Sequence, residues 1–261
     1  MVPTDPQPEL SAGAMMTDTP SEPFNPHPVE LSQEIRDMLN SCATATLVGH
    51  LQGRGIRNCF LSGLKPTRPD LRLLGYALTL RYLPLREDRL KELAGGINPQ
   101  RQASEYCGPD DVIIMEARNV PDAGTIGDIF AMRAQRRGAA GVITDGALRD
   151  TPAISKMAFP VYHQASHAAT WGRHHMPLAC NVPIACAGVS VFPGDILVGD
   201  GEGVVVIPPA IVEEVARACY AQEQEETFAL ERVDAGESTI GLFPLSAERR
   251  PEFEAWLAAR G

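Results

Sequence analysis

The second half of the chain repeats a pattern of apolar runs and amphipathic segments. Residues 110–117, 139–146 and 159–164 each contain an apolar run with the length of a buried strand, and the second ends in an Asp-Gly pair typical of a turn. Residues 125–138 have apolar positions at helical spacing. This strand–helix–strand order predicts a layered α/β domain with parallel strand pairs. Two short strands around a Gly-rich turn at 194–208 add an antiparallel part, so we expect a mixed sheet.

The first half of the chain is less regular. Ser32 can cap the first of two short helices expected over residues 31–55. Residues 71–84 mix apolar runs with alternation and predict a strand. The polar stretch 86–107 is expected to hold one helix over 88–93, followed by a loop.

The helix expected at 125–138 has a defined apolar face. It places Ile129, Met132 and Ala134 near one side, and Gly138 ends it. A loop at 119–124 precedes this helix.

We expect one main domain over residues 29–237, which closes with a long helix at 210–233. Residues 1–28 are rich in Pro, Ser, Thr and acidic residues and predict a flexible arm. Residues 238–261 form a tail. The apolar residues through which this tail could dock on a neighbouring subunit are Phe253, Trp256 and Leu257.

Composition excludes several classes of protein. A net charge of -10 argues against a general nucleic-acid binder, which needs a basic face. No window approaches the roughly 18 consecutive apolar residues of a membrane span, and the start of the chain does not read as a secretory signal. The six cysteines are scattered without CxxC spacing. We therefore expect free thiols and a cytoplasmic protein.

The first candidate for chemistry is the stretch TIGDIF, in which Gly127 stands at the start of a helix. The free N–H groups and the dipole of a helix start attract anions, and a glycine lets a ligand carboxylate approach the backbone. In the alternative interpretation, Thr125 caps the helix and Asp128 only favours its first turn.

The second candidate is the pair Arg149 and Asp150, which comes after the strand expected at 139–146. Ligands of parallel α/β sheets bind beyond the carboxyl ends of the strands. Asp150 could bind a divalent cation such as Mg²⁺, and Arg149 could hold an oxyanion. Alternatively, Asp150 caps a short helix near Thr151, and Arg149 is a solvated charge.

Twenty residues, one helix and one strand, separate Asp128 from Arg149, so the two candidates can meet at one edge of the sheet. The Asp-x20-Arg-Asp spacing strongly resembles that of the RraA-like proteins, as do the stretches RRGAAGVITDGALRD and PGDILVGDGEGVVVIP. The resemblance covers about residues 39–237. It implies a βαβ sandwich that resembles a swivelling domain.

This superfamily includes the class II 4-hydroxy-4-methyl-2-oxoglutarate/4-carboxy-4-hydroxy-2-oxoadipate aldolases. The resemblance implies that Arg149 binds substrate, that Asp150 ligates Mg²⁺ or Mn²⁺, and that Asp128 holds a metal-bound water. The segment that binds pyruvate in these aldolases, largely through backbone amides, matches Gly127, Asp128, Ile129 and Phe130.

The resemblance also implies a homo-oligomer, a trimer or a hexamer, with sites at subunit interfaces. A glutamate from the long C-terminal helix of an adjacent subunit would reach the metal-bound water, and the candidates are Glu225 and Glu226. With Asp128 and Arg149 as catalytic residues, the expected reaction is retro-aldol cleavage of a 4-hydroxy-2-oxo acid to pyruvate, or decarboxylation of oxaloacetate. The metal and Arg149 would stabilise the pyruvate enolate.

Two other functions stay open. RraA proteins proper bind and inhibit ribonuclease E and lack the acid that Asp150 supplies here, which favours the enzyme. A metal-dependent dehydratase or related lyase acting on a sugar acid could use the same residues. The sequence also departs from the aldolases: Phe130 comes after the glycine where an aliphatic pattern is usual, and 86–107 is longer and more polar. These changes fall where the distal groups of a substrate would lie.

Zinc sites are less favoured. His163 and His167 are four residues apart, but they come after a strand and lack an HExxH context. Later residues also lack finger spacing, and a proline interrupts them; they are His174, His175, Cys180 and Cys186.

Overall fold

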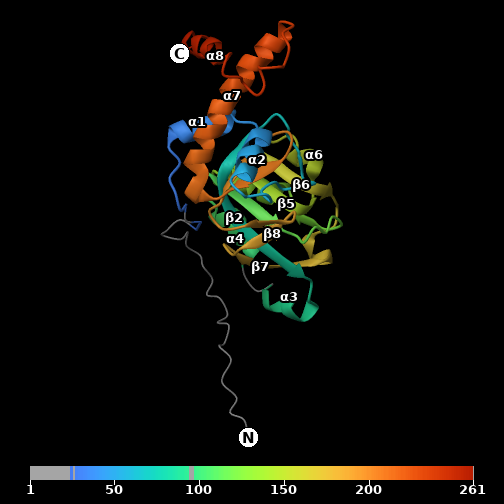
Figure 1. The fold of residues 1–261 in the computed structure, drawn as a ribbon. Coiled ribbons are helices and arrows are strands. Elements are labelled where there is room, and N and C mark those ends of the chain that lie inside the picture. The colour runs from blue at the N-terminus through green and yellow to red at the C-terminus, as the bar shows by residue number, and fades with distance from the viewer. Residues whose placement is uncertain (1–23, 26, 94–96, 261) are drawn as a thin grey trace.

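The computed structural model describes residues 24–25, 27–93 and 97–260. A mixed sheet of nine strands lies at its centre, with helices on its faces (Figure 1). Seven of the strands have the order β1-β6-β5-β3-β2-β10-β11. Of the other two, β4 pairs with β5 and β7 pairs with β2. The predicted α/β class and the mixed sheet are confirmed.

The parallel core contains the strands that the apolar runs predicted. Four strands are parallel to their neighbours: β2 (Leu73–Pro84), β3 (Asp111–Glu116), β5 (Gly141–Leu148) and β6 (Val161–Ser166). The Asp145–Gly146 pair is not a turn, because β5 runs through it to Leu148 with an irregularity in its register against β6. Burial of Asp145 explains the difference: its carboxylate accepts the N–H groups of Asn119 and Ala187, each at 3.2 Å.

The antiparallel part is larger than predicted. The expected hairpin is formed by β10 (Ile196–Gly199) and β11 (Val204–Ile207), and β10 is antiparallel to β2. Short strands that the sequence did not predict complete the structure: β1 (Lys65–Pro66), β4 (Gly124–Ile126), β7 (His175–Cys180), and the separate pair β8 (Ile184–Cys186) and β9 (Val189–Val191).

Alternating side chains of the sheet enter two different cores, as strand geometry requires. In β3, Ile113 and Met115 pack on one side with the helices α4 (Pro99–Tyr106) and α5 (Asp128–Arg136), whereas Val112 packs on the other side with residues of β8 and β9. A third cluster joins the hairpin to α1 (Gln33–Ser41), α2 (Thr44–Gly53) and the first half of α7 (Val212–Asp234).

The predicted helix starts are partly right. The Ser32 hydroxyl caps α1 by accepting the N–H of Ile35 at 3.3 Å, as expected. The segment expected as one helix and a loop holds two helices, α3 (Glu87–Leu93) and α4. The short α6 (Thr151–Ile154) and the long α7 were both predicted.

The face expected for α5 is right only at Ala134. Ile129 and Met132 are 79% and 49% exposed, and α5 packs on the core through Ala131 and Ala134. The small alanine side chains let the helix lie close to the sheet, so the larger apolar residues face outward.

The end of the chain forms an arm. The second half of α7 projects from the body and carries α8 (Arg250–Ala258) at its far end (Figure 1). Phe253 is buried against Phe228 of α7, and Trp256 packs on the same pair. The tail therefore packs on its own chain, while Leu257 is 40% exposed. Docking of this tail on a neighbouring subunit stays a prediction.

The predicted N-terminal arm falls mostly on residues 1–23 and 26, which lie outside the described residues. Its described end is anchored on the body: Asn25 and His27 both contact the buried carboxylate of Asp111, at 2.8 and 2.9 Å, and His27 stacks on Tyr76. All six cysteines are free thiols, as expected. No helix within the described ranges is long and apolar enough to cross a membrane.

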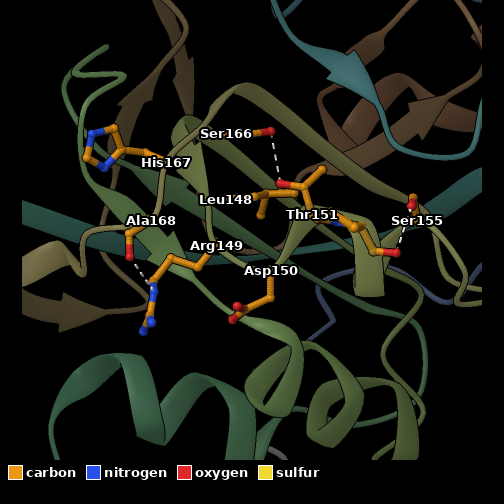
Figure 2. A pocket seen from close by; sticks show the side chains of 9 residues that line it. Leu148, Arg149, Asp150, Thr151, Ser155, Ser166, His167 and Ala168 are labelled. Carbon is orange, nitrogen blue, oxygen red and sulfur yellow. Dashed lines mark hydrogen bonds between the residues drawn. The ribbon is translucent and has the colours of Figure 1, made fainter.

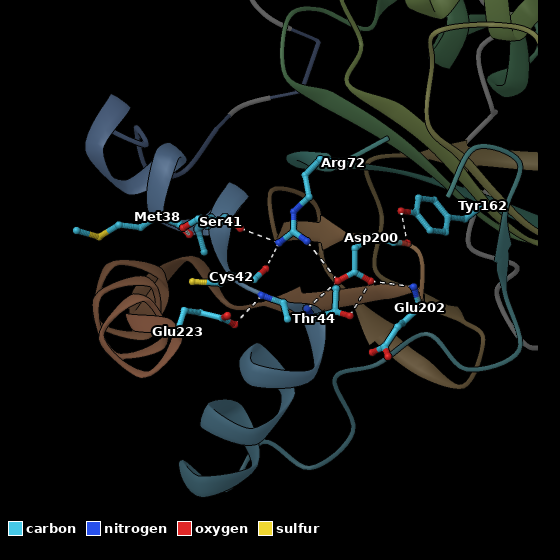
Figure 3. A network of polar contacts seen from close by, with 11 residues as sticks. Met38, Ser41, Cys42, Thr44, Arg72, Tyr162, Asp200, Glu202 and Glu223 are labelled. Atoms are coloured by element: carbon cyan, nitrogen blue, oxygen red, sulfur yellow. Dashed lines mark hydrogen bonds and ion pairs between the residues drawn. The ribbon is translucent and has the colours of Figure 1, made fainter. Parts of the chain in front are cut away.

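A polar network joins the hairpin to the helical layer (Figure 3). The Asp200 carboxylate accepts the N–H and the hydroxyl of Thr44 at the start of α2, at 2.9 and 2.8 Å, and it pairs with Arg72 at 3.2 Å. Burial disfavours the charge of Asp200, yet the hydrogen bonds from Thr44 and Glu202 and the charge of Arg72 together lower its pKa. The charged carboxylate therefore stabilises this junction.

Candidate active site

Strand β4 brings the two predicted halves of the site together. It pairs with the last residues of β5, and the N–H of Arg149 donates to the carbonyl of Ile126 at 2.9 Å. A Cβ atom placed on Gly127 would lie 2.7 Å from Oδ2 of Asp150. The helix start and the Arg-Asp pair thus meet at the carboxyl edge of the parallel strands, as the spacing predicted.

Gly127 is the N-cap residue of α5 and provides no side-chain cap. Thr125 does not cap the helix, so that alternative is wrong: its hydroxyl is buried and bonds to Thr144 at 2.9 Å. The Oδ1 atom of Asp128 accepts a hydrogen bond from the N–H of Ile129 at 2.8 Å. Because Asp128 itself engages the N–H of Ile129, an anionic ligand would use the remaining N–H groups at the start of α5, where the helix dipole favours negative charge.

Asp150 has a conformation that is uncommon outside glycine. Its φ of 54° and ψ of 31° lie in the left-handed region, which costs a non-glycine residue of the order of 1 kcal/mol or more. Although Asp150 occupies the N-cap position of α6, its side chain makes no cap hydrogen bond. The capping interpretation is thus wrong. The strained backbone instead turns an exposed carboxylate toward Gly127.

Arg149 is half-buried and held from one side. Its Nε donates to the carbonyl of Ala168 at 3.0 Å (Figure 2), which leaves the two terminal nitrogens of the guanidinium for a ligand. A side chain at Gly124 would collide with the Arg149 stem, so the glycine provides the space through which the arginine passes. Arg149 is consequently not a freely solvated charge.

Two cavities adjoin this pair. One, of about 520 Å³, is lined by Gly127, Asp128, Ile129 and Phe130 together with Arg149 and Asp150. The other, of about 710 Å³, lies on the far side of Arg149 and Asp150 and is lined by Thr151, Ser166 and His167 (Figure 2). All the residues predicted for one subunit's share of the binding site thus line a single cleft.

Several lining residues were not predicted from the sequence. Gln100, Arg101 and Glu105 come from α4, and Thr170 and Trp171 come from the segment after β6. The signal for α4 was present, because Asn98 followed by Pro99 is a typical helix start, and the Asn98 side chain does accept the N–H of Arg101 at 3.0 Å. Gln100 is buried and donates to the carbonyl of Thr125, which fixes α4 to the floor of the cleft.

Comparison with known proteins agrees with this geometry. Residues 44–206, more than half of the chain, match the RraA-like family, described as Aldolase/RraA. The chain belongs to the RraA-like family.

A protein of Halalkalibacterium halodurans, provisionally named a 4-hydroxy-4-methyl-2-oxoglutarate aldolase, is 32% identical over 157 residues, which cover 57% of this chain and 74% of that protein. Protein DlpA of Legionella pneumophila is 28% identical over 77% of this chain, which spans only 33% of DlpA. Among solved structures, RraAS2 of Streptomyces coelicolor, described as an unusual member of the RNase ES inhibitor RraA protein family, is 29% identical. It has a TM-score of 0.67, covering 77% of this chain and 98% of that one.

The donors in the cleft suit some metals better than others. Within the described part of the chain, no group of three or more His, Cys, Asp or Glu side chains is placed to hold a metal ion. Zinc sites need three or four such ligands. Mg²⁺ needs only one or two carboxylates and keeps several waters, which fits the exposed carboxylate of Asp150 beside a polar cleft.

The histidines considered as zinc ligands have other partners. His163 lies in β6 with its Nδ1 at 2.8 Å from the carbonyl of Ala165, and burial lowers its pKa. His174 contacts Asp122 at 2.9 Å. His175 is buried beside Tyr82 and accepts from Arg118 at 3.0 Å; burial, then the charge of Arg118, lower its pKa to about 4. His175 is therefore neutral at pH 7.

The glutamates expected from an adjacent subunit lie on α7. Glu225 pairs with Arg250 of α8 at 3.0 Å, and Glu226 accepts from Gln222 at 2.7 Å. Neither lines the cleft of its own chain. A contribution from another subunit stays a prediction.

Proposed function

We propose that this protein is a divalent-metal-dependent lyase that acts on a 2-oxo acid. It would cleave a 4-hydroxy-2-oxo acid to pyruvate by a retro-aldol step, or decarboxylate oxaloacetate. The observation that carries the proposal is the meeting of Gly127, Arg149 and Asp150 in one cleft, with Asp150 held toward Gly127 by a strained backbone. The provisional aldolase name of a relative supports the same reaction class.

The chain's own residues would bind the 2-oxo acid end of the substrate. The terminal nitrogens of Arg149 suit the bidentate recognition of a carboxylate or of an oxyanion that develops beside it. The N–H groups at the start of α5 other than that of Ile129 would bind a second oxygen, and Gly127 adds no side chain that would obstruct it. Together they orient the carbon chain so that its distal part extends along the cleft.

Asp150 is the residue we propose as the direct ligand of Mg²⁺ or Mn²⁺, with Asp128 bound through water. When bound, the cation would act as a Lewis acid that polarises the 2-oxo group, so no lysine is needed. Asp128 lines the same cavity, and the N–H of Ile129 holds its Oδ1. Its other oxygen, Oδ2, stays able to accept the proton that leaves the 4-hydroxyl group, directly or through a water.

The subunit arrangement is part of the proposal. We propose a homo-oligomer, a trimer or a hexamer, in which Glu225 or Glu226 of one subunit approaches the cleft of the next. The projecting second half of α7, which bears both glutamates, is consistent with such a role (Figure 1).

A pyruvate-release assay tests the function. Purified protein is mixed with 4-hydroxy-4-methyl-2-oxoglutarate or with oxaloacetate in the presence of Mg²⁺, and pyruvate is measured with and without EDTA. Arg149→Ala removes an oxyanion partner and should lower kcat by about 10²–10³-fold. Asp150→Ala should abolish the activity that EDTA removes. Asp234→Ala, on the exposed end of α7, should change neither kcat nor the loss of activity in EDTA. Turnover that survives both EDTA and Asp150→Ala would contradict the metal-dependent mechanism.

A second candidate function is supported by the likeness to RraAS2, whose description names an RNase ES inhibitor family. In that case the acidic chain would bind ribonuclease E as a non-catalytic regulator. Direct binding to ribonuclease E at micromolar concentration, together with no pyruvate release from any tested oxo acid, would favour this candidate over the enzyme.

A further inference from the structure

We propose that Arg101, supported by Phe130, determines substrate specificity by binding a carboxylate at the distal end of the substrate. This inference rests on the proposed function, in which Arg149 and the start of α5 hold the 2-oxo acid end. Arg101 lines the same 520 Å³ cavity as Gly127, Asp128 and Arg149.

The position of Arg101 is fixed by the fold. Its backbone N–H is capped by Asn98 in the first turn of α4, and the neighbouring Gln100 is buried against the carbonyl of Thr125. Ala103 packs α4 into the core that α5 also enters. The Arg101 side chain therefore extends from a well-anchored helix into the wall of the cavity that Arg149 and Asp150 also line.

The charges around the cavity leave Arg101 without an anionic partner. Glu105, one helical turn away, pairs with Arg133 at 2.7 Å. One oxygen of Asp128 is engaged by the N–H of Ile129, and Asp150 lies against Gly127. No ion pair within the described part of the chain includes Arg101. A guanidinium on the wall of an anion-binding cleft is thus free to meet a ligand.

Phe130 holds this guanidinium near the cleft. The Arg101 Cζ lies 5.9 Å from the centre of the Phe130 ring, within the range of a cation–π contact. Such a contact favours a guanidinium held beside the cleft, and a side chain that is already ordered loses less entropy when it binds a carboxylate.

Two arginines in one small cavity suit a ligand with two carboxylates. Arg149 would take the carboxylate next to the oxo group, and Arg101 would take the one at the far end. A chain that ends in a methyl group would gain nothing from Arg101. The expected preference is therefore for dicarboxylic 2-oxo acids over monocarboxylic ones of the same length.

Calorimetric titration without turnover tests this preference. The probes are 2-oxoglutarate and 2-oxopentanoate, which have the same number of carbons and differ in the distal carboxylate, each titrated into the full-length protein in saturating Mg²⁺. We expect the wild type to bind 2-oxoglutarate about tenfold more tightly, as one charge-assisted contact implies. Arg101→Gln should remove this preference while the Kd of 2-oxopentanoate stays unchanged, and Phe130→Leu should reduce it in part.

Arg136→Gln is the matched control, because it removes the same charge from an exposed position on α5 outside the cavity lining. It should keep the tenfold preference. If 2-oxopentanoate binds but 2-oxoglutarate binds no better, or if Arg101→Gln weakens both equally, the role of Arg101 is refuted and the proposed function stands. If neither acid binds, the proposed function fails and the role of Arg101 fails with it.

Discussion

Gly127→Ala separates the chemistry of the site from the stability of the fold. Gly127 has φ of -117° and ψ of 179°, an extended conformation that any residue adopts, so the backbone itself does not require glycine. The added methyl group would meet Asp150, whose Oδ2 lies 2.7 Å from the new Cβ position, and Arg149 Cβ at 3.8 Å is in ordinary contact. The conflict therefore falls on the proposed metal ligand.

These distances set the size of the effect. Ordinary van der Waals contact begins at 3.4 Å, so the Asp150 carboxylate must withdraw by 0.7 Å. A displacement of about 1 Å at a reacting centre can cost about 10²-fold in rate, so kcat/KM should fall by about 10–100-fold. Replacing glycine by alanine at an N-cap costs about 0.5–1 kcal/mol. For a chain of this size the Tm should fall by only about 1–4 °C.

Pyruvate release in Mg²⁺ and a thermal unfolding scan measure the two effects on the same preparation. Gly49→Ala is the matched control, because a Cβ atom there has nothing within 4 Å and Gly49 lies inside α2. Alanine should raise helix stability there by up to about 1 kcal/mol and leave the kinetics unchanged. If Gly127→Ala keeps wild-type kcat/KM, Asp150 does not act from the position the structure gives it, and the arrangement proposed for the site is wrong.

Three further predictions concern stability. Asp200→Asn should cost about 1–3 kcal/mol at pH 7 in urea unfolding, because it removes a charged acceptor of hydrogen bonds. Because its pKa is lowered, the Asp200 carboxylate stabilises the fold above the ordinary value of 3.8 and loses that contribution as pH falls through its folded pKa; the variant should lack this acid-sensitive part. His175 has a folded pKa of about 4 against 6.5, so the unfolded chain binds more protons and stability should fall from pH 6.5 toward 4; the free energy of unfolding of His175→Gln should vary less over this range. Phe253→Ala should speed hydrogen exchange in α8 and the second half of α7 while the central sheet stays protected; equal loss of protection throughout would show that the arm is not a separate unit.

Local signals explain which elements could be predicted. Ser32, the apolar runs of the parallel strands and the Gly-rich hairpin each act through neighbours in sequence, so their structure was recognisable. The short strands β4 and β7 have no such signal, because three to six residues, one of them a proline in β7, become strands only when a long partner is available. The exposed Ile129 shows the same limit: its helix packs on the sheet through alanines, and only the sheet decides which face that is.

The sequence by itself determined which reactive residues are available: a glycine at a helix start, and an arginine and an aspartate one helix and one strand later, in a chain of net charge -10. The spacing predicted that these residues could meet, but only the tertiary structure decided how they do: the pairing of β4 with β5 sets Gly127 beside Asp150, and the left-handed turn at Asp150 directs its carboxylate. It also placed Arg101 in the lining of the same cavity, on a helix whose start was recognisable in the sequence but whose contact with the site was not. The physical reason is the distance along the chain over which each signal acts. Residue types and spacings report on interactions between near neighbours in the sequence, whereas a binding site depends on contacts between distant segments that meet only when the sheet has formed.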